Sequence, residues 1–139
     1  MSDEKTKMVI VMRKDLNMRK GKMISQGCHA SMKVLLDLMI RRKSFADEEN
    51  EINYTLHLEP NCALDQWLTG LFTKVVVYVN SDVELFKVYT IAVAKGIICS
   101  LIEDAGKTEF HGMPTYTCCA IGPDFEDKID EVTGGLPLL

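Results

Sequence analysis

Residues 8–40 decide the fold and read MVIVM (8–12), RKDLNMRKGK (13–22) and MISQGCHASMKVLLDLMI (23–40). The apolar run at 8–12 predicts a strand, and the apolar periodicity from about 22 to 40 predicts a helix. The loop between them is rich in cations and contains a glycine. Such a loop is a common anion site, because the free amides of the first helical turn and the positive end of the helix dipole face it.

The charges in this loop are opposite to those that a helix start prefers. Arg19, Lys20 and Lys22 crowd the predicted N-terminus, where cations cost a few tenths of a kcal/mol each. Either a phosphate-bearing ligand offsets this repulsion, or the loop is a solvated basic surface on which screening makes the penalty negligible. The residues alone leave both interpretations open.

Helical spacing divides the segment into stripes. One stripe is polar and contains Lys22, Gln26, His29 and Lys33. It is either the solvent-exposed face of an amphipathic helix or a functional surface. Its two cations, amide and imidazole, with no carboxylate before Asp37, favour the functional interpretation. Two further stripes are predicted to be buried, and they consist of Ile24, Cys28, Ser31 and Leu35, and of Ala30, Val34 and Leu38.

Length and composition are those of one globular domain, here residues 1–139, with 47% hydrophobic and 26% charged residues. No apolar run approaches the ~18 residues of a membrane span, and the polar start is not a secretory signal. Five cysteines without a C-x-x-C pair predict a reduced, cytoplasmic setting. Most of the positive charge lies in residues 1–43 and most of the negative charge follows, which predicts a localised basic face for a polyanion partner.

The rest of the chain alternates between strand and helix patterns, after a polar excursion at 41–62. We predict this excursion, which contains an acidic cluster at 47–49, to be a loop or a short irregular segment with a brief extended piece at 54–58. Predicted strands are 74–79, 97–102 and 115–121. Predicted helices are 63–72, closed near Gly70, then 82–95, capped by Ser81, and 124–131. This order predicts an α/β fold, a single-domain layered structure with a four-stranded, mostly parallel sheet flanked by helices. The connection at 104–114 is too short for a helical crossover, so the last two strands run antiparallel and the sheet is mixed.

The loops after two strands are predicted to converge. Residues 14–22 and 103–108 both leave carboxyl ends of strands, where ligands of such sheets gather. Lys22, Gln26 and His29 would then face Asp104 and Thr108, a set suited to water activation and charge stabilisation. The simpler interpretation of D-A-G at 104–106 is an ordinary turn. No nucleophile elbow, zinc motif, P-loop or dinucleotide fingerprint is present, and three scattered histidines predict no metal site.

Three motifs and the tail carry a family resemblance. They are VMRKDLNMRKGKMISQGCHA (11–30), SLIEDAGKTEFHGMPT (100–115), CAIGPD (119–124) and TGGLPL (133–138). In this order and spacing, they resemble the type 2 (archaeal/eukaryotic-type) peptidyl-tRNA hydrolases over nearly the whole chain. The differences are modest: Ile24-Ser25 replaces a pair of small residues, Gly135 replaces a polar residue in the tail, and the 41–62 excursion is longer than in compact members.

The resemblance implies hydrolysis of the ester between a peptide and tRNA, which recycles tRNA, with no cofactor and often in a homodimer. The catalytic set carried over by motif is Lys22, Gln26, His29, Asp104 and Thr108. The basic loop and helix would hold phosphates of the tRNA acceptor end, a salt-sensitive contact. The residues expected to make it are Arg13, Lys14, Arg19, Lys20 and Lys33.

The expected roles follow from the chemistry of each group. Asp104 orients or deprotonates the attacking water, although a carboxylate of ordinary pKa is a weak base. Lys22 stabilises the oxyanion, Thr108 and Gln26 position the ester, and His29 gives further polar support. Two alternatives stay open, a catalytically silent RNA- or protein-binding module and a hydrolase of another acyl ester.

Overall fold

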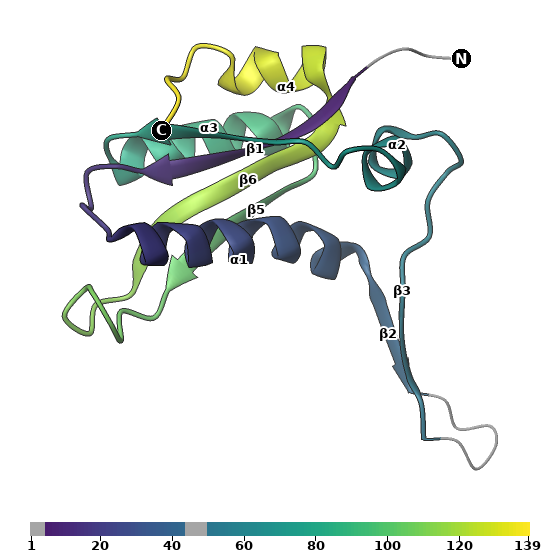
Figure 1. Cartoon of the computed structure of the whole chain (residues 1–139), viewed down its shortest axis with the longest axis horizontal. Coiled ribbons are helices and arrows are strands. Elements are labelled where there is room, and N and C mark those ends of the chain that lie inside the picture. Colours follow the sequence, from purple (N-terminus) through teal and green to yellow (C-terminus); the bar gives the residue numbers. More distant parts are fainter. Residues whose placement is uncertain (1–4, 44–49) are drawn as a thin grey trace.

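The computed structural model describes residues 5–43 and 50–139, in which a four-stranded sheet lies between two helical layers (Figure 1). The sheet order is β4-β1-β6-β5. The strands of the sheet are β1 (Thr6–Arg13), β4 (Lys74–Val79), β5 (Cys99–Asp104) and β6 (Thr115–Phe125). The helices are α1 (Lys20–Leu38), α2 (Ala63–Thr69), α3 (Asp82–Ala94) and α4 (Glu126–Thr133).

The strand directions confirm the predicted mixed sheet. β1 and β4 pair in parallel, whereas β6 pairs antiparallel with both β1 and β5. Three strands therefore run in one direction and β6 runs against them. As a result, β1 and β5 end at the same edge of the sheet, although β6 separates them.

Alternation along β1 explains how the sheet supports two cores. Met8, Ile10 and Met12 are buried in one core, on the face covered by α1 and α2, and Val9 and Val11 are buried in the other. α3 and α4 cover that second face (Figure 1). Because both faces are packed, the middle of the strand at 8–12 is apolar without interruption, as in the sequence pattern.

Local signals set most element ends. The Ser81 hydroxyl accepts a hydrogen bond from the Glu84 amide at 3.1 Å and caps α3, as predicted. α2 ends at Gly70, also as predicted. The predicted end of the last strand at residue 121 is wrong, because β6 continues through Gly122 and the cis peptide bond before Pro123 to pair with the start of β1.

The excursion at 41–62 is not only a loop, which corrects the prediction for this segment. Residues Ile40–Lys43 (β2) and Ile52–Thr55 (β3) form a two-stranded antiparallel ribbon that extends away from the sheet (Figure 1). The strands are short and mostly exposed, and β2 carries three consecutive cations, so it lacks the alternation that identifies a half-buried strand. The acidic cluster at 47–49 lies outside the described residues.

The C-terminal tail covers the outer edge of β4. Leu138 forms an antiparallel bridge with Val77, and the Leu139 amide donates to the Val76 carbonyl oxygen at 3.1 Å. The Tyr78 amide donates to the Pro137 carbonyl oxygen at 3.0 Å. The tail thereby satisfies backbone groups that an edge strand otherwise leaves unpaired.

Candidate active site

The ammonium of Lys22 joins the two loops that the sequence predicts to converge. Its Nζ lies 2.8 Å from Asp104 Oδ1 and 2.8 Å from Thr108 Oγ1. Lys22 lies in the first turn of α1, Asp104 ends β5, and Thr108 lies in the β5–β6 loop. Only 13% of each side chain of the ion pair is exposed, so solvent weakens this pair less than a surface one.

Gln26 completes the network from one turn further along α1. Its Nε2 donates to Asp104 Oδ1 at 3.2 Å, and its Oε1 accepts from the Thr117 hydroxyl at 2.6 Å. Gln26 and Thr117 are both buried. Because a hydroxyl donates to the Gln26 oxygen, the amide nitrogen is directed toward the carboxylate.

The loop after β5 holds the Asp104 carboxylate from its other side. The Gly106 amide donates to Asp104 Oδ2 at 2.8 Å, in a turn where Gly106 has φ +80°. A Cβ at Gly106 would lie 2.3 Å from the Met113 carbonyl oxygen, so this position requires glycine. The D-A-G segment is thus a turn, and the same turn fixes the carboxylate.

These contacts lower the pKa of Asp104. The hydrogen bond from Lys22 is the largest cause, while partial burial acts in the opposite direction and the Gly106 amide adds to the lowering. A lowered pKa makes Asp104 a weaker base than an ordinary carboxylate. The geometry therefore favours orientation of Lys22 and of a water by Asp104 over deprotonation of that water.

A polar cavity of about 440 Å³ opens beside Thr108. Asn17 with φ 53° shapes the loop before α1, and the Arg19 amide donates to the Glu109 carboxylate at 3.4 Å across the cavity. The residues lining the cavity are Leu16, Asn17, Arg19, Thr108 and Glu109. Space of this size next to the Lys22–Thr108 contact can admit part of a small polar group.

His29 and Lys33 continue the predicted stripe but lie apart from the network. Both side chains are exposed, and Lys33 Nζ pairs with Asp37 Oδ1 at 3.1 Å. Within the described parts of the chain, His29 has no side-chain hydrogen-bond partner in the network of Lys22, Gln26 and Asp104. The structure thus brings four of the five candidate catalytic residues together and places His29 on the solvent face.

The cations of the loop before α1 lie in different surroundings. Arg13 is bound to Asp15 at 2.7 Å and to the Tyr116 carbonyl oxygen at 3.0 Å, so it braces the loop against β6. Lys14 Nζ lies 4.4 Å from the centre of the Tyr78 ring. Arg19 and Lys20 are exposed, Arg19 beside the polar cavity and Lys20 beside an apolar groove.

Thr117 is the site residue that the sequence analysis missed. The signal in the sequence is the hydroxyl of Thr117, which directly precedes the apolar run CCAI at 118–121 in the predicted strand. Its neighbour Cys118 donates its thiol to the Gln26 carbonyl oxygen at 3.3 Å, and burial raises the pKa of Cys118 to about 11. That thiol is protonated at neutral pH and packs rather than reacts.

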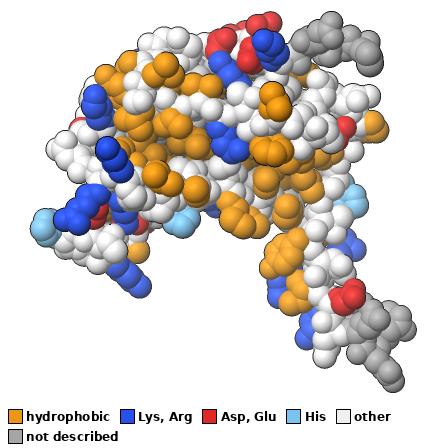
Figure 2. Space-filling view, in the orientation of Figure 1, with side chains coloured by type: hydrophobic (Ala, Val, Ile, Leu, Met, Phe, Trp, Pro, Cys, Tyr) orange, Lys and Arg blue, Asp and Glu red, His pale blue; other side chains and the backbone are white. Residues whose placement is uncertain are grey.

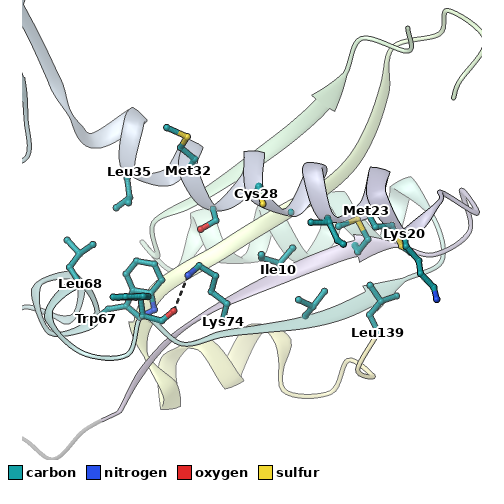
Figure 3. A pocket seen from close by; sticks show the side chains of 16 residues that line it. Ile10, Lys20, Met23, Cys28, Met32, Leu35, Trp67, Leu68, Lys74 and Leu139 are labelled. Atoms are coloured by element: carbon teal, nitrogen blue, oxygen red, sulfur yellow. Dashed lines mark hydrogen bonds between the residues drawn. The ribbon is translucent and has the colours of Figure 1, made fainter. Parts of the chain in front are cut away.

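An apolar groove of about 880 Å³ lies along the other side of α1, between α1, α2 and β4 (Figure 3). Figure 2 shows hydrophobic side chains gathered over this face. The predicted burial of the Ile24 stripe is wrong, because Ile24 is 67% exposed and Cys28 is exposed in the groove. Met23 and Lys20 lie at one end of the groove, and Met32, Leu35 and Leu68 lie toward the other (Figure 3).

No cluster of three or more His, Cys, Asp or Glu side chains is arranged to hold a metal ion in 5–43 and 50–139. In the same ranges, every helix is too short or too polar to cross a membrane.

The family model described as "Peptidyl-tRNA hydrolase PTH2" matches residues 6–139. The peptidyl-tRNA hydrolase of Methanocaldococcus jannaschii is 44% identical, over 96% of this chain and 99% of that one. That of Metallosphaera sedula is 38% identical over the same shares. A protein of unknown function from Agrobacterium tumefaciens strain C58 shares the fold, with a TM-score of 0.54 at 13% identity over 100% of this chain and 99% of that chain. The resemblance in the motifs is confirmed, and the chain belongs to the peptidyl-tRNA hydrolase PTH2 family.

Proposed function

We propose that the protein hydrolyses the ester that joins a peptide to the terminal ribose of tRNA. The observation that carries this proposal is the Lys22–Asp104–Thr108 contact beside a polar cavity, in a chain whose relatives carry the name peptidyl-tRNA hydrolase. The reaction needs a water, a group that stabilises negative charge on the ester oxygen, and a surface that holds the anionic tRNA. Each is supported by residues of the site.

Lys22 is the oxyanion-stabilising group in this proposal. An ammonium has three N–H donors, and Asp104 and Thr108 engage two of them. The third remains for the carbonyl oxygen of the ester, where negative charge develops as water attacks the carbonyl carbon. Because Asp104 and Thr108 fix the ammonium in advance, little reorganisation is needed during the reaction.

Asp104, Gln26 and Thr108 are positioning groups. Asp104 Oδ1 accepts hydrogen bonds from Lys22 and Gln26, and Oδ2 accepts one from Gly106. A remaining lone pair on Oδ2 can hold the attacking water. As its oxygen bonds to the carbonyl carbon and the ester bond breaks, the proton that this water loses passes to the leaving ribose oxygen. The Thr108 hydroxyl accepts from Lys22, so its proton can be donated to the substrate. His29 is exposed nearby on the same helix and serves as an outer polar support.

The basic residues contact the phosphates near the tRNA acceptor end. Arg19 lies at the mouth of the polar cavity, and Lys14, Lys20 and Lys33 are exposed around the start and middle of α1. Such contacts are insensitive to base sequence and weaken as salt is added. Arg13 acts mainly by holding the loop in place, because its guanidinium is already bound to Asp15 and to the Tyr116 carbonyl oxygen.

Turnover of a defined peptidyl-tRNA by Lys22→Ala tests the catalytic assignment. We expect kcat to fall about 10²- to 10³-fold with an unchanged circular dichroism spectrum, as for loss of one oxyanion donor. The matched control is Lys128→Ala, which removes an exposed cation on the opposite face of the sheet. A folded Lys22→Ala protein with normal kcat would contradict the assignment, and no turnover by the unsubstituted protein would support the binding-module alternative.

We also propose that two copies pair through the apolar groove. Several large side chains on or beside it are exposed, among them Ile24 (67%) and Met32 (62%), and contiguous apolar patches of this kind mark interaction surfaces. We expect Ile24→Glu with Met32→Glu to convert a dimer into a monomer by light scattering. Val83→Glu, at a 71% exposed position on α3, is the matched control. An unchanged mass for the groove variant would contradict pairing through this face.

The cytoplasm is the proposed location. All five cysteines are free thiols, and the proposed substrate arises in translation. A thiol count on freshly purified protein in denaturant should give all five groups in the reduced form.

A further inference from the structure

The β2–β3 ribbon has no role in the site described above. It continues directly from the C-terminal end of α1, and all four residues of β2 are exposed. In Figure 1, the ribbon extends away from the sheet, below α1, as does the loop between β5 and β6 at the other end of the helix. An isolated two-stranded ribbon gains little stability from its own contacts. Its residues therefore contribute little to the stability of the fold, and a binding role is the natural one to consider.

The register of the ribbon shows how its side chains are grouped. Arg41 lies opposite Tyr54 and Lys43 lies opposite Ile52, and residues directly opposite each other share a face. One face therefore carries two cations around an aromatic side chain that is 58% exposed. Arg42 lies opposite Asn53 on the other face, so basic and polar groups occupy both sides.

The ribbon lies at a defined distance from the reactive group. Lys22 is in the first turn of α1 and Leu38 ends it, which separates them by about 24 Å along the helix axis. His29 and Lys33 are exposed along the helix between these points. A ligand that reaches from the site to the ribbon must therefore be long. The cations at the two ends of this path, Lys22 at the site and residues 41–43 in the ribbon, favour a polyanion.

We propose that the β2–β3 ribbon binds the RNA backbone of the substrate at a distance from the ester. This inference rests on the proposed function, because it takes tRNA as the ligand. Arg41, Arg42 and Lys43 contact phosphates, and Tyr54 packs its ring and hydroxyl against the neighbouring sugars. RNA duplexes are commonly recognised in this way, through phosphates and 2′-hydroxyl groups rather than base sequence.

The composition of the strands favours RNA over a protein partner. Three of the four residues of β2 are cationic, whereas the centre of a protein interface is depleted of charged residues and concentrates apolar groups. The apolar side chains Ile40 and Ile52 lie on opposite faces of the ribbon and do not form one patch. In the connecting segment, the acidic residues at 47–49 lie outside the described residues, and Glu51 is exposed directly before β3, so the proposal concerns the two strands alone.

The test is the salt dependence of binding to deacylated tRNA by a variant with Arg41→Ala, Arg42→Ala and Lys43→Ala. We expect affinity to fall on the order of tenfold at moderate salt, and the slope of log affinity against log salt to decrease by up to about 3. The matched control changes Lys87, Lys95 and Lys128 to Ala. Lys87 lies in α3, Lys95 is the C-cap of α3 and Lys128 lies in α4, so the control removes the same charge from the other face of the sheet. Equal effects of the two variants, or no effect of the ribbon variant, would overturn the proposal.

A second measurement separates this inference from the proposed function. The ribbon variant should lose kcat/KM on full-length peptidyl-tRNA and keep it on a short substrate, a peptide ester of a CCA trinucleotide, which cannot reach the ribbon. If the unsubstituted protein turns over neither substrate, the proposed function fails. If the ribbon variant loses kcat/KM equally on both substrates, or dissociates a dimer without a change in tRNA affinity, only the assignment of the ribbon to RNA fails.

Discussion

Asp104 accepts at least three hydrogen bonds, and these bonds determine the protonation state of its carboxyl group. Lys22 and Gln26 donate to one oxygen and Gly106 to the other. Each contact stabilises the ionised form, and together they hold the pKa of the carboxyl group below its usual value. A carboxylate held in this way stays charged over the whole physiological range and keeps the Lys22 ammonium in place.

The pH dependence of stability should reveal this carboxylate. Because the folded-state pKa of Asp104 is lowered, its contribution is complete above the unfolded-state value near 3.8 and is lost as pH falls through the folded-state pKa. Asp104→Asn should therefore lower the free energy of unfolding by about 1–3 kcal/mol near neutral pH, as expected for hydrogen bonds to charged groups.

Urea unfolding of both proteins over a series of pH values measures this difference. The gap between them should be constant from neutral pH down to about the unfolded-state pKa and then close. A gap that closes well above that pH would mean that the pKa of Asp104 is raised, which would restore Asp104 as a candidate general base.

Thr117 acts on the site only through Gln26. Thr117→Val keeps the shape of the side chain but leaves the buried Gln26 Oε1 without its 2.6 Å donor, so the amide loses its fixed orientation. We expect kcat to fall about tenfold with little change in KM, because charge placement rather than tRNA binding is altered. Thr117→Ser should restore kcat, and a Thr117→Val enzyme with normal kcat would show that this hydrogen bond has no positioning role.

At the scale of elements, the β5–β6 loop is the part that assembles the site, since it carries Thr108 and follows directly after Asp104. Its shape depends on two glycines with positive φ, Gly106 (+80°) and Gly112 (+78°), joined by a 2.9 Å hydrogen bond from the Gly112 amide to the Gly106 carbonyl oxygen. The two glycines differ in the room available for a side chain. A Cβ at Gly106 would strike the Met113 backbone, whereas a Cβ at Gly112 meets no atom within 4 Å.

This difference gives a matched pair of variants. Gly112→Ala has only the strain of a positive φ, roughly 1–2 kcal/mol, and should keep normal kcat. Gly106→Ala adds the clash, displaces the amide that holds Asp104, and should lower both kcat and the thermal midpoint. Turnover and thermal unfolding of the two variants measure this, and equal activity would mean that the loop adapts without moving the carboxylate.

The sequence predicted the helices and strands that have strong hydrophobic patterns, and it predicted that the loops after β1 and β5 converge. The apolar strands, the capped helix α3 and the convergence of Lys22 with Asp104 follow from periodicity and from the rule that the carboxyl ends of parallel strands share an edge. The ribbon did not follow, because one isoleucine followed by three cations carries no alternation. Exposure of Ile24 did not follow either, because amphipathic patterns do not show whether an apolar face is covered within one chain.

At the scale of the whole molecule, the two faces of α1 have separate uses. One face buries Gln26 and directs Lys22 toward β5, and the other lines the apolar groove. Gly27 is buried between them, and a Cβ added there would lie in ordinary van der Waals contact with Ile10 and Met12, so an alanine would fit at this position. The proposed dimer would therefore cover the groove while the reactive network on the other face of the helix stays open to tRNA.

The pairing of Pro137–Leu139 with β4 has a consequence for handling the protein. Removal of residues 136–139 would leave the amide of Tyr78 and the carbonyl of Val76 without the partners that the tail provides. A bare strand of the composition KVVVYV is a template on which another molecule can add its own strand. The shortened protein should therefore scatter light and precipitate at concentrations where the full chain stays clear, so purification tags belong at the other terminus.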